Sequence, residues 1–131
     1  MKWIYQGHLS KKITIQLFDN EYIGSIDLSF LENLEYINYK VYNLLPDECP
    51  FNFTNTVYGY NLKVLKQHQN KGYGKKIIQE SENYLKKSCI NFFFLDRETN
   101  NEKLNKFYKK TEFKDILVSP EYILFYKSIY K

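Results

Sequence analysis

A change of hydrophobic period lies within residues 62–78, whose sequence is LKVLKQHQNKGYGKKII. In its first part apolar and polar residues alternate, which is typical of a β-strand, and in its last part apolar residues recur with the spacing of one face of a helix. Gly72 and Gly74 stand where that helix would begin. The stretch therefore predicts a strand, a glycine-containing loop and a helix, in that order.

The predicted loop, residues 69–74, has the features of a phosphate site. A helix N-terminus carries unpaired N–H groups and the positive end of the helix dipole, and glycines let an anion approach the backbone closely. Lys71, Lys75 and Lys76 add positive charge. The pattern is neither a P-loop nor a dinucleotide-binding fingerprint. A plain strand-to-helix turn is the alternative.

Four segments before the loop read as strands because apolar residues alternate with polar ones along them. Short turns join the first three, which predicts an antiparallel meander. Residues 31–53 fit helix and strand equally well. The predicted strands are residues 2–9, 12–18, 22–30 and 56–65, and on the last one we expect a single face to carry Tyr58, Tyr60, Leu62 and Val64.

The chain after the loop predicts helices and further strands. Apolar residues fall on one helical stripe, polar residues on the other side, and the apolar run at 89–95 is typical of a buried strand. Residues 99–102 (TNNE) form a capping-box pattern that opens a second helix, and two strands follow at 116–118 and 122–130. The stripe residues of the two helices are Ile77, Ile78 and Leu85, and Leu104, Phe107 and Tyr108.

Composition bounds the class of protein. The 131 residues are 44% hydrophobic and 26% charged, with a net charge of +4, which suits one globular domain over residues 1–131. Cys49 and Cys89 provide neither a disulfide framework nor metal-ligand spacing, so we expect no metal. With no leader sequence and no apolar run long enough to span a bilayer, we expect a cytoplasmic protein without a membrane partner.

Two patterns resemble those of one family. The pattern Leu62-x-Val64, then Gln69-x-x-Gly72-x-Gly74 and a helix, resembles the acetyl-CoA-binding motif of the GNAT N-acetyltransferase superfamily. The pattern Asn101-x-x-Leu104-x-x-Phe107-Tyr108, ending at Phe113, resembles a later motif of the same family at matching spacing. The resemblance covers roughly residues 54–131 and implies a GNAT-like α+β fold. Its sheet would be mixed but mostly antiparallel, with about six or seven strands flanked by helices.

The resemblance also implies roles for individual residues. The loop amides would hold the pyrophosphate of coenzyme A, and the strand before the loop would pair with the pantetheine arm. The Leu62 amide would contact the thioester carbonyl as an oxyanion-type donor, and Tyr108 would protonate the departing thiolate. A core aromatic position is the alternative for Tyr108. The implied cofactor-binding residues are Leu62, Val64, Gln69, Asn70, Lys71, Gly72, Tyr73, Gly74, Lys75, Asn101 and Tyr108.

The chain departs from the family pattern mainly at the acceptor end. Glu112 replaces the glycine before Phe113, and Tyr58 stands where some members place a glutamate base. His68 is the one basic side chain nearby that could accept a proton, although a loop histidine is usually solvated. The N-terminal helical region of the family is reduced here.

The sequence thus predicts an acetyl-CoA-dependent N-acetyltransferase that acts on a primary amine of a small molecule or a protein. One alternative is a coenzyme A-binding module without catalysis, favoured by Glu112 and the missing base. Another is a basic nucleic-acid binder, whose phosphate contacts and stacking would come from many tyrosines and from Lys86, Lys87, Lys109 and Lys110. The lysines would be solvated on helix faces in any case, so we do not expect nucleic acid as a partner. The acceptor stays open, as does a homodimer.

Overall fold

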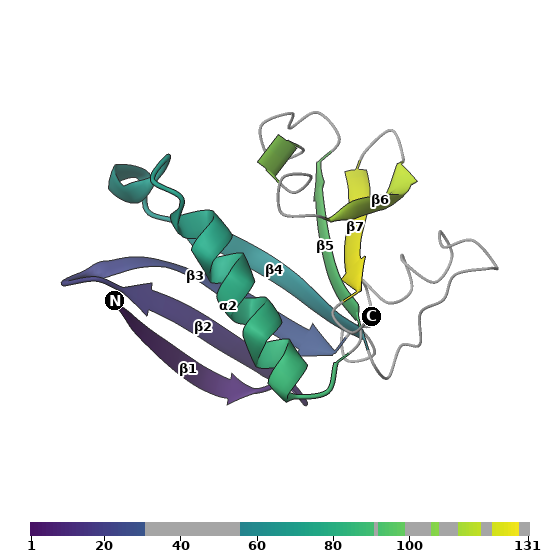
Figure 1. Ribbon diagram of the computed structural model, residues 1–131, viewed down its shortest axis with the longest axis horizontal. Helices are drawn as coiled ribbons and strands as arrows, with labels where there is room; N and C mark the ends of the chain where they lie inside the picture. The colour runs from purple at the N-terminus through teal and green to yellow at the C-terminus, as the bar shows by residue number, and fades with distance from the viewer. Residues whose placement is uncertain (31–55, 91, 99–105, 108–112, 119–121, 129–131) are drawn as a thin grey trace.

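The computed structural model describes residues 1–30, 56–90, 92–98, 106–107, 113–118 and 122–128. Within these ranges one mixed sheet has the strand order β1-β2-β3-β4-β5-β7-β6, and helix α2 (Tyr73–Lys87) crosses one of its faces (Figure 1). The predicted α+β class is confirmed. The strands are β1 (Lys2–His8), β2 (Lys12–Phe18), β3 (Tyr22–Phe30), β4 (Thr56–Val64), β5 (Phe92–Glu98), β6 (Lys114–Val118) and β7 (Tyr122–Ser128). The reduced N-terminal helical region stays a prediction, and residues 31–53, which fit helix and strand equally well in the sequence, lie outside the described residues.

Strands β1 to β4 form an antiparallel half of the sheet. Ile15 pairs with Ile26, and Ile13 pairs with Leu28. Three of these four side chains are completely buried, and Ile13 is nearly so. The alternation in the sequence therefore predicted this meander correctly, because the apolar set of each strand shares one covered face.

Helix α2 supplies that cover. It packs against β2, β3 and β4, and its buried residues are Ile77, Ile78, Ser81 and Leu85. This confirms the stripe expected from the sequence. The buried Ser81 hydroxyl donates to the Ile77 carbonyl at 2.8 Å, so this hydroxyl is paired although it lies among apolar side chains. Lys86 and Lys87 lie in the last turn, where positive charge stabilises the helix dipole.

Strand β1 is also joined to α2 by side chains. The Tyr5 ring stacks on Tyr84 with centroids 5.6 Å apart, and its hydroxyl donates to the Glu80 carboxylate. Burial raises the pKa of the Tyr5 hydroxyl, and the neighbouring Glu80 raises it further. The phenol therefore remains a neutral donor.

The apolar run at 89–95 is divided between two elements, so the strand predicted there begins too early. Cys89 has φ 60, and Ile90 donates its N–H to the Leu85 carbonyl at 3.0 Å. This left-handed closure ends helix α2 and buries Ile90 against the core. Strand β5 starts only at Phe92 and continues through the charged residues to Glu98.

A parallel pairing joins the two halves of the sheet. It runs from Thr56 opposite Phe92 to Gly59 opposite Leu95. A Cβ atom on Gly59 would lie 2.6 Å from the Phe93 ring and 2.8 Å from Leu95 Cδ2. The missing side chain therefore leaves room for these two buried residues.

We expect Gly59→Ala to destabilise the protein by about 1–3 kcal/mol, because the added methyl overpacks this contact. Urea denaturation would measure the loss. Lys63→Ala, an exposed change on the same strand, should stay within about 0.5 kcal/mol of wild type. Equal midpoints for wild type and Gly59→Ala would contradict the packing account.

Candidate functional site

Strands β4 and β5 separate halfway along β4 (Figure 1). Their pairing ends at Gly59 and Leu95, although β4 continues beside β3 to Val64 and β5 continues beside β7 to Glu98. At the same point β4 changes from fully buried to alternately exposed. In the part of the chain that the structure describes, β4 thus has an open edge over residues 60–64.

A β-bulge lies at the start of this open edge. Tyr60 pairs with Asp27 and Lys63 with Ser25, so Asn61 and Leu62 together face a single residue of β3. Asn61 has φ 55, a left-handed conformation that asparagine adopts more readily than most residues.

The bulge divides the side chains of β4 between the two faces of the sheet. Val64 pairs with Gly24, whose Cβ position is 3.1 Å from Ile77 of α2, and Leu62 packs against the same core. Tyr60 instead shares the opposite face with Asp27. The single face expected for Tyr58, Tyr60, Leu62 and Val64 is therefore wrong, because the extra residue shifts the alternation by one position.

The bulge also reverses the direction of the backbone groups. The Leu65 N–H donates to the Ile23 carbonyl at 2.9 Å, so odd-numbered residues face β3 here and the amides of Leu62 and Val64 face the open edge. In an unbulged strand, the alternation from Tyr60 would direct the Leu62 amide to β3. The open edge consequently offers N–H groups to a ligand lying along β4.

Hydrogen bonds hold the loop after β4 against the end of this strand. A short helix, η3 (Lys66–His68), follows β4. The Gln69 side chain donates from Nε2 to the Val64 carbonyl at 2.9 Å, and the Gln69 N–H donates to the Lys66 carbonyl at 3.3 Å. The backbone and side-chain nitrogens of Gln69 are thus both bonded within the protein. The residue fixes the loop in place.

The N-terminus of α2 opens towards solvent without a side-chain cap. Gly72 is its N-cap with φ 85, and the first turn holds no acidic residue. The first backbone bond of the helix joins the Lys76 N–H to the Gly72 carbonyl at 3.2 Å, which leaves the amides of Tyr73, Gly74 and Lys75 without intrahelical acceptors. No heavy atom of the described residues lies within 4 Å of a Cβ position on Gly72. An anion can therefore reach these amides.

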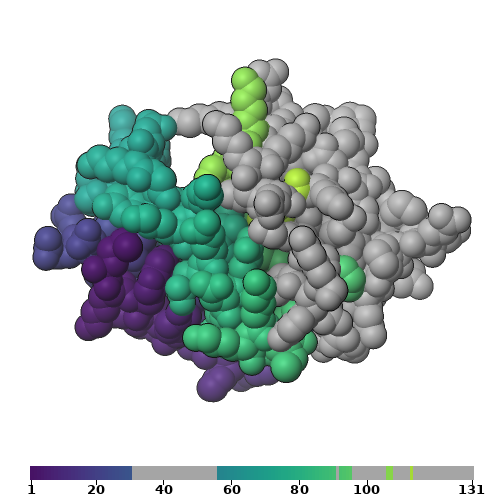
Figure 2. Space-filling model, viewed as in Figure 1, coloured from purple at the N-terminus to yellow at the C-terminus, as the bar shows by residue number. Residues whose placement is uncertain are grey.

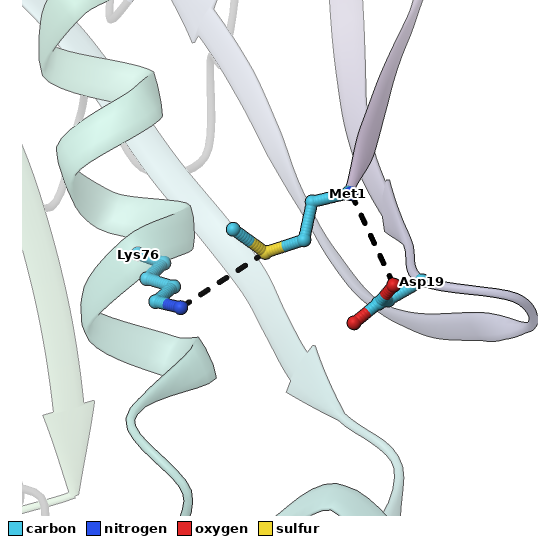
Figure 3. A network of polar contacts seen from close by, with 3 residues as sticks. All are labelled: Met1, Asp19 and Lys76. Atoms are coloured by element: carbon cyan, nitrogen blue, oxygen red, sulfur yellow. Dashed lines mark hydrogen bonds and ion pairs between the residues drawn. The ribbon is translucent and has the colours of Figure 1, made fainter.

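The three lysines near the N-terminus of α2 differ in their contacts. Lys71 and Lys75 are exposed, and no described carboxylate forms an ion pair with either. Lys76 lies over the Tyr73 ring, 5.5 Å from its centroid, and its Nζ is 4.0 Å from the Met1 sulfur. The Met1 ammonium is 3.9 Å from Asp19 (Figure 3). Lys76, one of the three lysines expected to attract an anion, thus contacts Tyr73 and Met1.

The two sequence motifs meet at Gly74. A Cβ atom there would lie 3.3 Å from the Phe107 ring, and residues 106–107 are helical. In Figure 2 an opening separates the loop after β4 from the segment 106–107. Asn101, Tyr108 and Glu112 lie outside the described residues, so the roles expected of Asn101 and Tyr108 stay predictions.

The His68 side chain contacts Glu21 and Tyr73. Its Nε2 lies 2.7 Å from the Glu21 carboxylate at the turn between β2 and β3, and its ring meets Tyr73 edge-on, with centroids 6.0 Å apart. These contacts help to hold the loop and do not place the imidazole at the open edge of β4.

Among the described residues, no group of three or more His, Cys, Asp or Glu side chains could hold a metal ion. No helix in these ranges has the length and apolar character needed to cross a membrane.

Comparison with known proteins identifies the family. Residues 6–113 match the model of the acetyltransferase (GNAT) family, and the chain belongs to this family. No curated protein matches the sequence.

Solved structures share the fold. The PaiA N-acetyltransferase from Thermoplasma acidophilum, in complex with coenzyme A, is 19% identical with a TM-score of 0.67, over 90% of this chain and 61% of that one. A candidate streptothricin acetyltransferase from Bacillus anthracis, in complex with acetyl coenzyme A, is 24% identical with a TM-score of 0.64, over 90% and 62%. The ribosomal-protein-S18-alanine N-acetyltransferase from Escherichia coli is 13% identical with a TM-score of 0.68, over 96% and 73%. This chain thus covers less than two thirds of the first two.

Substitutions at Gly72 should test the loop backbone. Gly72→Val should lower stability by about 1–3 kcal/mol, because a β-branched residue is strained at positive φ although space is free. Gly72→Asn should cost clearly less, since asparagine tolerates this conformation. Denaturation of the three proteins gives the order, and equal losses for both variants would contradict the backbone explanation.

Proposed function

We propose that this chain binds acetyl-coenzyme A along the open edge of β4 and transfers the acetyl group to a primary amine. The observation that supports this best is that the open edge of β4 and the N-terminus of α2 follow one another along the chain. An edge with outward-facing amides at Leu62 and Val64 leads, through a loop fastened by Gln69, to an uncapped helix N-terminus. An extended ligand with an amide-containing arm and a charged pyrophosphate matches both ends.

The arm of the ligand would lie beside β4. Its amide groups can pair with strand backbone in the way an added strand pairs with a sheet edge. Leu62 and Val64 supply the backbone groups in this proposal. Asn101 would supply a further bond to the arm, as the family resemblance implies.

The pyrophosphate would sit at the start of α2. Amides of residues 70–75 and the side chains of Lys71 and Lys75 would contact it, and each hydrogen bond to a charged oxygen contributes roughly 1.5–3 kcal/mol. Gln69 contributes by holding the loop, because its own nitrogens are bonded within the protein. Gly72 keeps the backbone accessible, and Gly74 leaves room for the Phe107 ring.

The reaction needs few protein groups. The nitrogen lone pair attacks the thioester carbonyl, a C–N bond forms, the C–S bond breaks and the amine loses a proton. The Leu62 amide would stabilise the negative charge that develops on the carbonyl oxygen. Tyr108 would give the departing thiolate its proton. The acceptor would be a small molecule or a protein, and the amine would lose its proton to solvent or to a base that is unassigned.

Binding measurements should separate the two ends of the ligand. Calorimetry should show coenzyme A binding at least about tenfold more tightly than pantetheine, which lacks the phosphates. Lys71→Ala with Lys75→Ala should reduce this advantage measurably, while the backbone amides keep the rest of it. The matched pair Lys86→Ala with Lys87→Ala, at the far end of α2, should leave it unchanged. Equal affinities for coenzyme A and pantetheine would sink the proposed pyrophosphate site.

Thiol release from acetyl-CoA across a panel of amines and peptides should test turnover. Tyr108→Phe should lower kcat by about 10²–10⁴-fold, because proton donation is lost, with coenzyme A affinity within about twofold of wild type. Tyr84→Phe, on α2, serves as the control and should keep full activity. Wild-type binding without thiol release on any amine would favour a catalytically silent coenzyme A-binding module.

A further inference from the structure

A chain of polar side chains links three strands beside the β4 bulge. Thr14 of β2 donates from Oγ1 to Asp27 Oδ1 at 2.6 Å. Asn61 of β4 donates from Nδ2 to Asp27 Oδ2 at 3.0 Å. Each oxygen of the part-buried Asp27 carboxylate thus accepts a bond from a different strand.

We propose that Thr14, Asp27 and Asn61 act as positioning residues, which hold the β4 bulge and so direct the Leu62 amide to the open edge. This inference rests on the proposed acetyl transfer at that edge. None of the three residues needs to touch the substrate. They act through the backbone of Leu62.

The bond between Asn61 and Asp27 is specific to the bulged register. Tyr60 pairs with Asp27 and shares its face, so in an unbulged strand the next side chain, Asn61, would point to the opposite face. The left-handed backbone of Asn61 brings its amide back to Asp27. The contact therefore stabilises the bulge against a one-residue slip, which would turn the Leu62 amide towards β3.

The segments on both sides of the bulge are held independently. Before it, the Tyr60 hydroxyl lies 3.1 Å from Ser29 Oγ, and Ser29 also donates to the Lys11 carbonyl at 2.8 Å. After it, Gln69 binds the Val64 carbonyl. Loss of the Asp27–Asn61 bond should therefore disturb the bulge locally and leave the pyrophosphate loop in place.

The variant Asn61→Asp tests this arrangement. Aspartate keeps the size of asparagine and tolerates positive φ, but it sets a second carboxylate against Asp27. With acetyl-CoA and the best amine of the panel, we expect kcat to fall by about 10²-fold or more, as when one oxyanion donor is lost. The dissociation constant of coenzyme A should change by less than about threefold, since the loop has its own bond to β4.

The exchanged pair Asp27→Asn with Asn61→Asp is the rescue. The amide introduced on β3 can accept from Thr14 and donate to the carboxylate introduced on β4, so kcat should return to within about fivefold of wild type. Failure of the exchanged pair to recover activity would overturn the proposal. So would an Asn61→Asp variant with wild-type kcat, or one that loses coenzyme A affinity as strongly as kcat.

Amide hydrogen exchange in the free protein gives a readout that does not depend on turnover. In the bulged register the Lys63 N–H faces β3 and the Leu62 N–H faces the open edge. Asn61→Asp should speed exchange at Lys63 by at least about tenfold, and the exchanged pair should restore its protection. Unchanged exchange of the Lys63 amide in Asn61→Asp would refute the proposal that the Asp27–Asn61 bond holds the bulge. If the wild-type protein transfers acetyl to no amine, the proposed function fails. The exchange measurement still decides whether the Asp27–Asn61 bond holds the bulge.

Discussion

The site depends on the loss of pairing between β4 and β5 beyond Gly59 and Leu95. Backbone N–H and C=O groups must find partners, and a strand that loses its neighbour presents a row of them at an open edge. Among the described residues no strand pairs with the β5 side of residues 60–64, and the one side-chain bond there is that of Gln69 Nε2 to the Val64 carbonyl. A ligand with its own amide groups can complete this edge, which is why the separation of two strands creates a binding site.

An open edge inside a sheet also carries a risk of pairing with another chain. Here the open segment is short, it contains the exposed Lys63, and a bulge interrupts it. The two halves of the sheet are joined where β4 and β5 still pair, and the Phe93 ring meets Phe113 edge-on there, with centroids 5.5 Å apart. Strong packing at one end lets the other end remain open.

Elements with a clear period could be predicted from the sequence, and the bulge could not. The stripe of Ile77, Ile78 and Leu85 and the alternation of β2 lead directly to α2 and the meander. On β4, residues 58–64 alternate without interruption, so nothing in the pattern signals that Asn61 breaks the register. In the structure the Asn61 side chain binds Asp27, which is 34 residues away along the chain. The glycines predicted the loop, but nothing in the pattern signals that the Gln69 side chain binds the Val64 carbonyl.

The described parts of the proposed site consist mostly of backbone groups, so such a site can persist while side chains change and the fold stays the same. A TM-score of 0.67 accompanies 19% identity in one relative, and 0.68 accompanies 13% in another. An N–H group needs a particular backbone direction but no particular side chain. Such a site requires residues that fix this direction, such as a glycine at positive φ or a side chain that holds a bulge. The acceptor amine has no such common backbone to bind, so side chains must recognise it, and their identities can differ from one family member to the next.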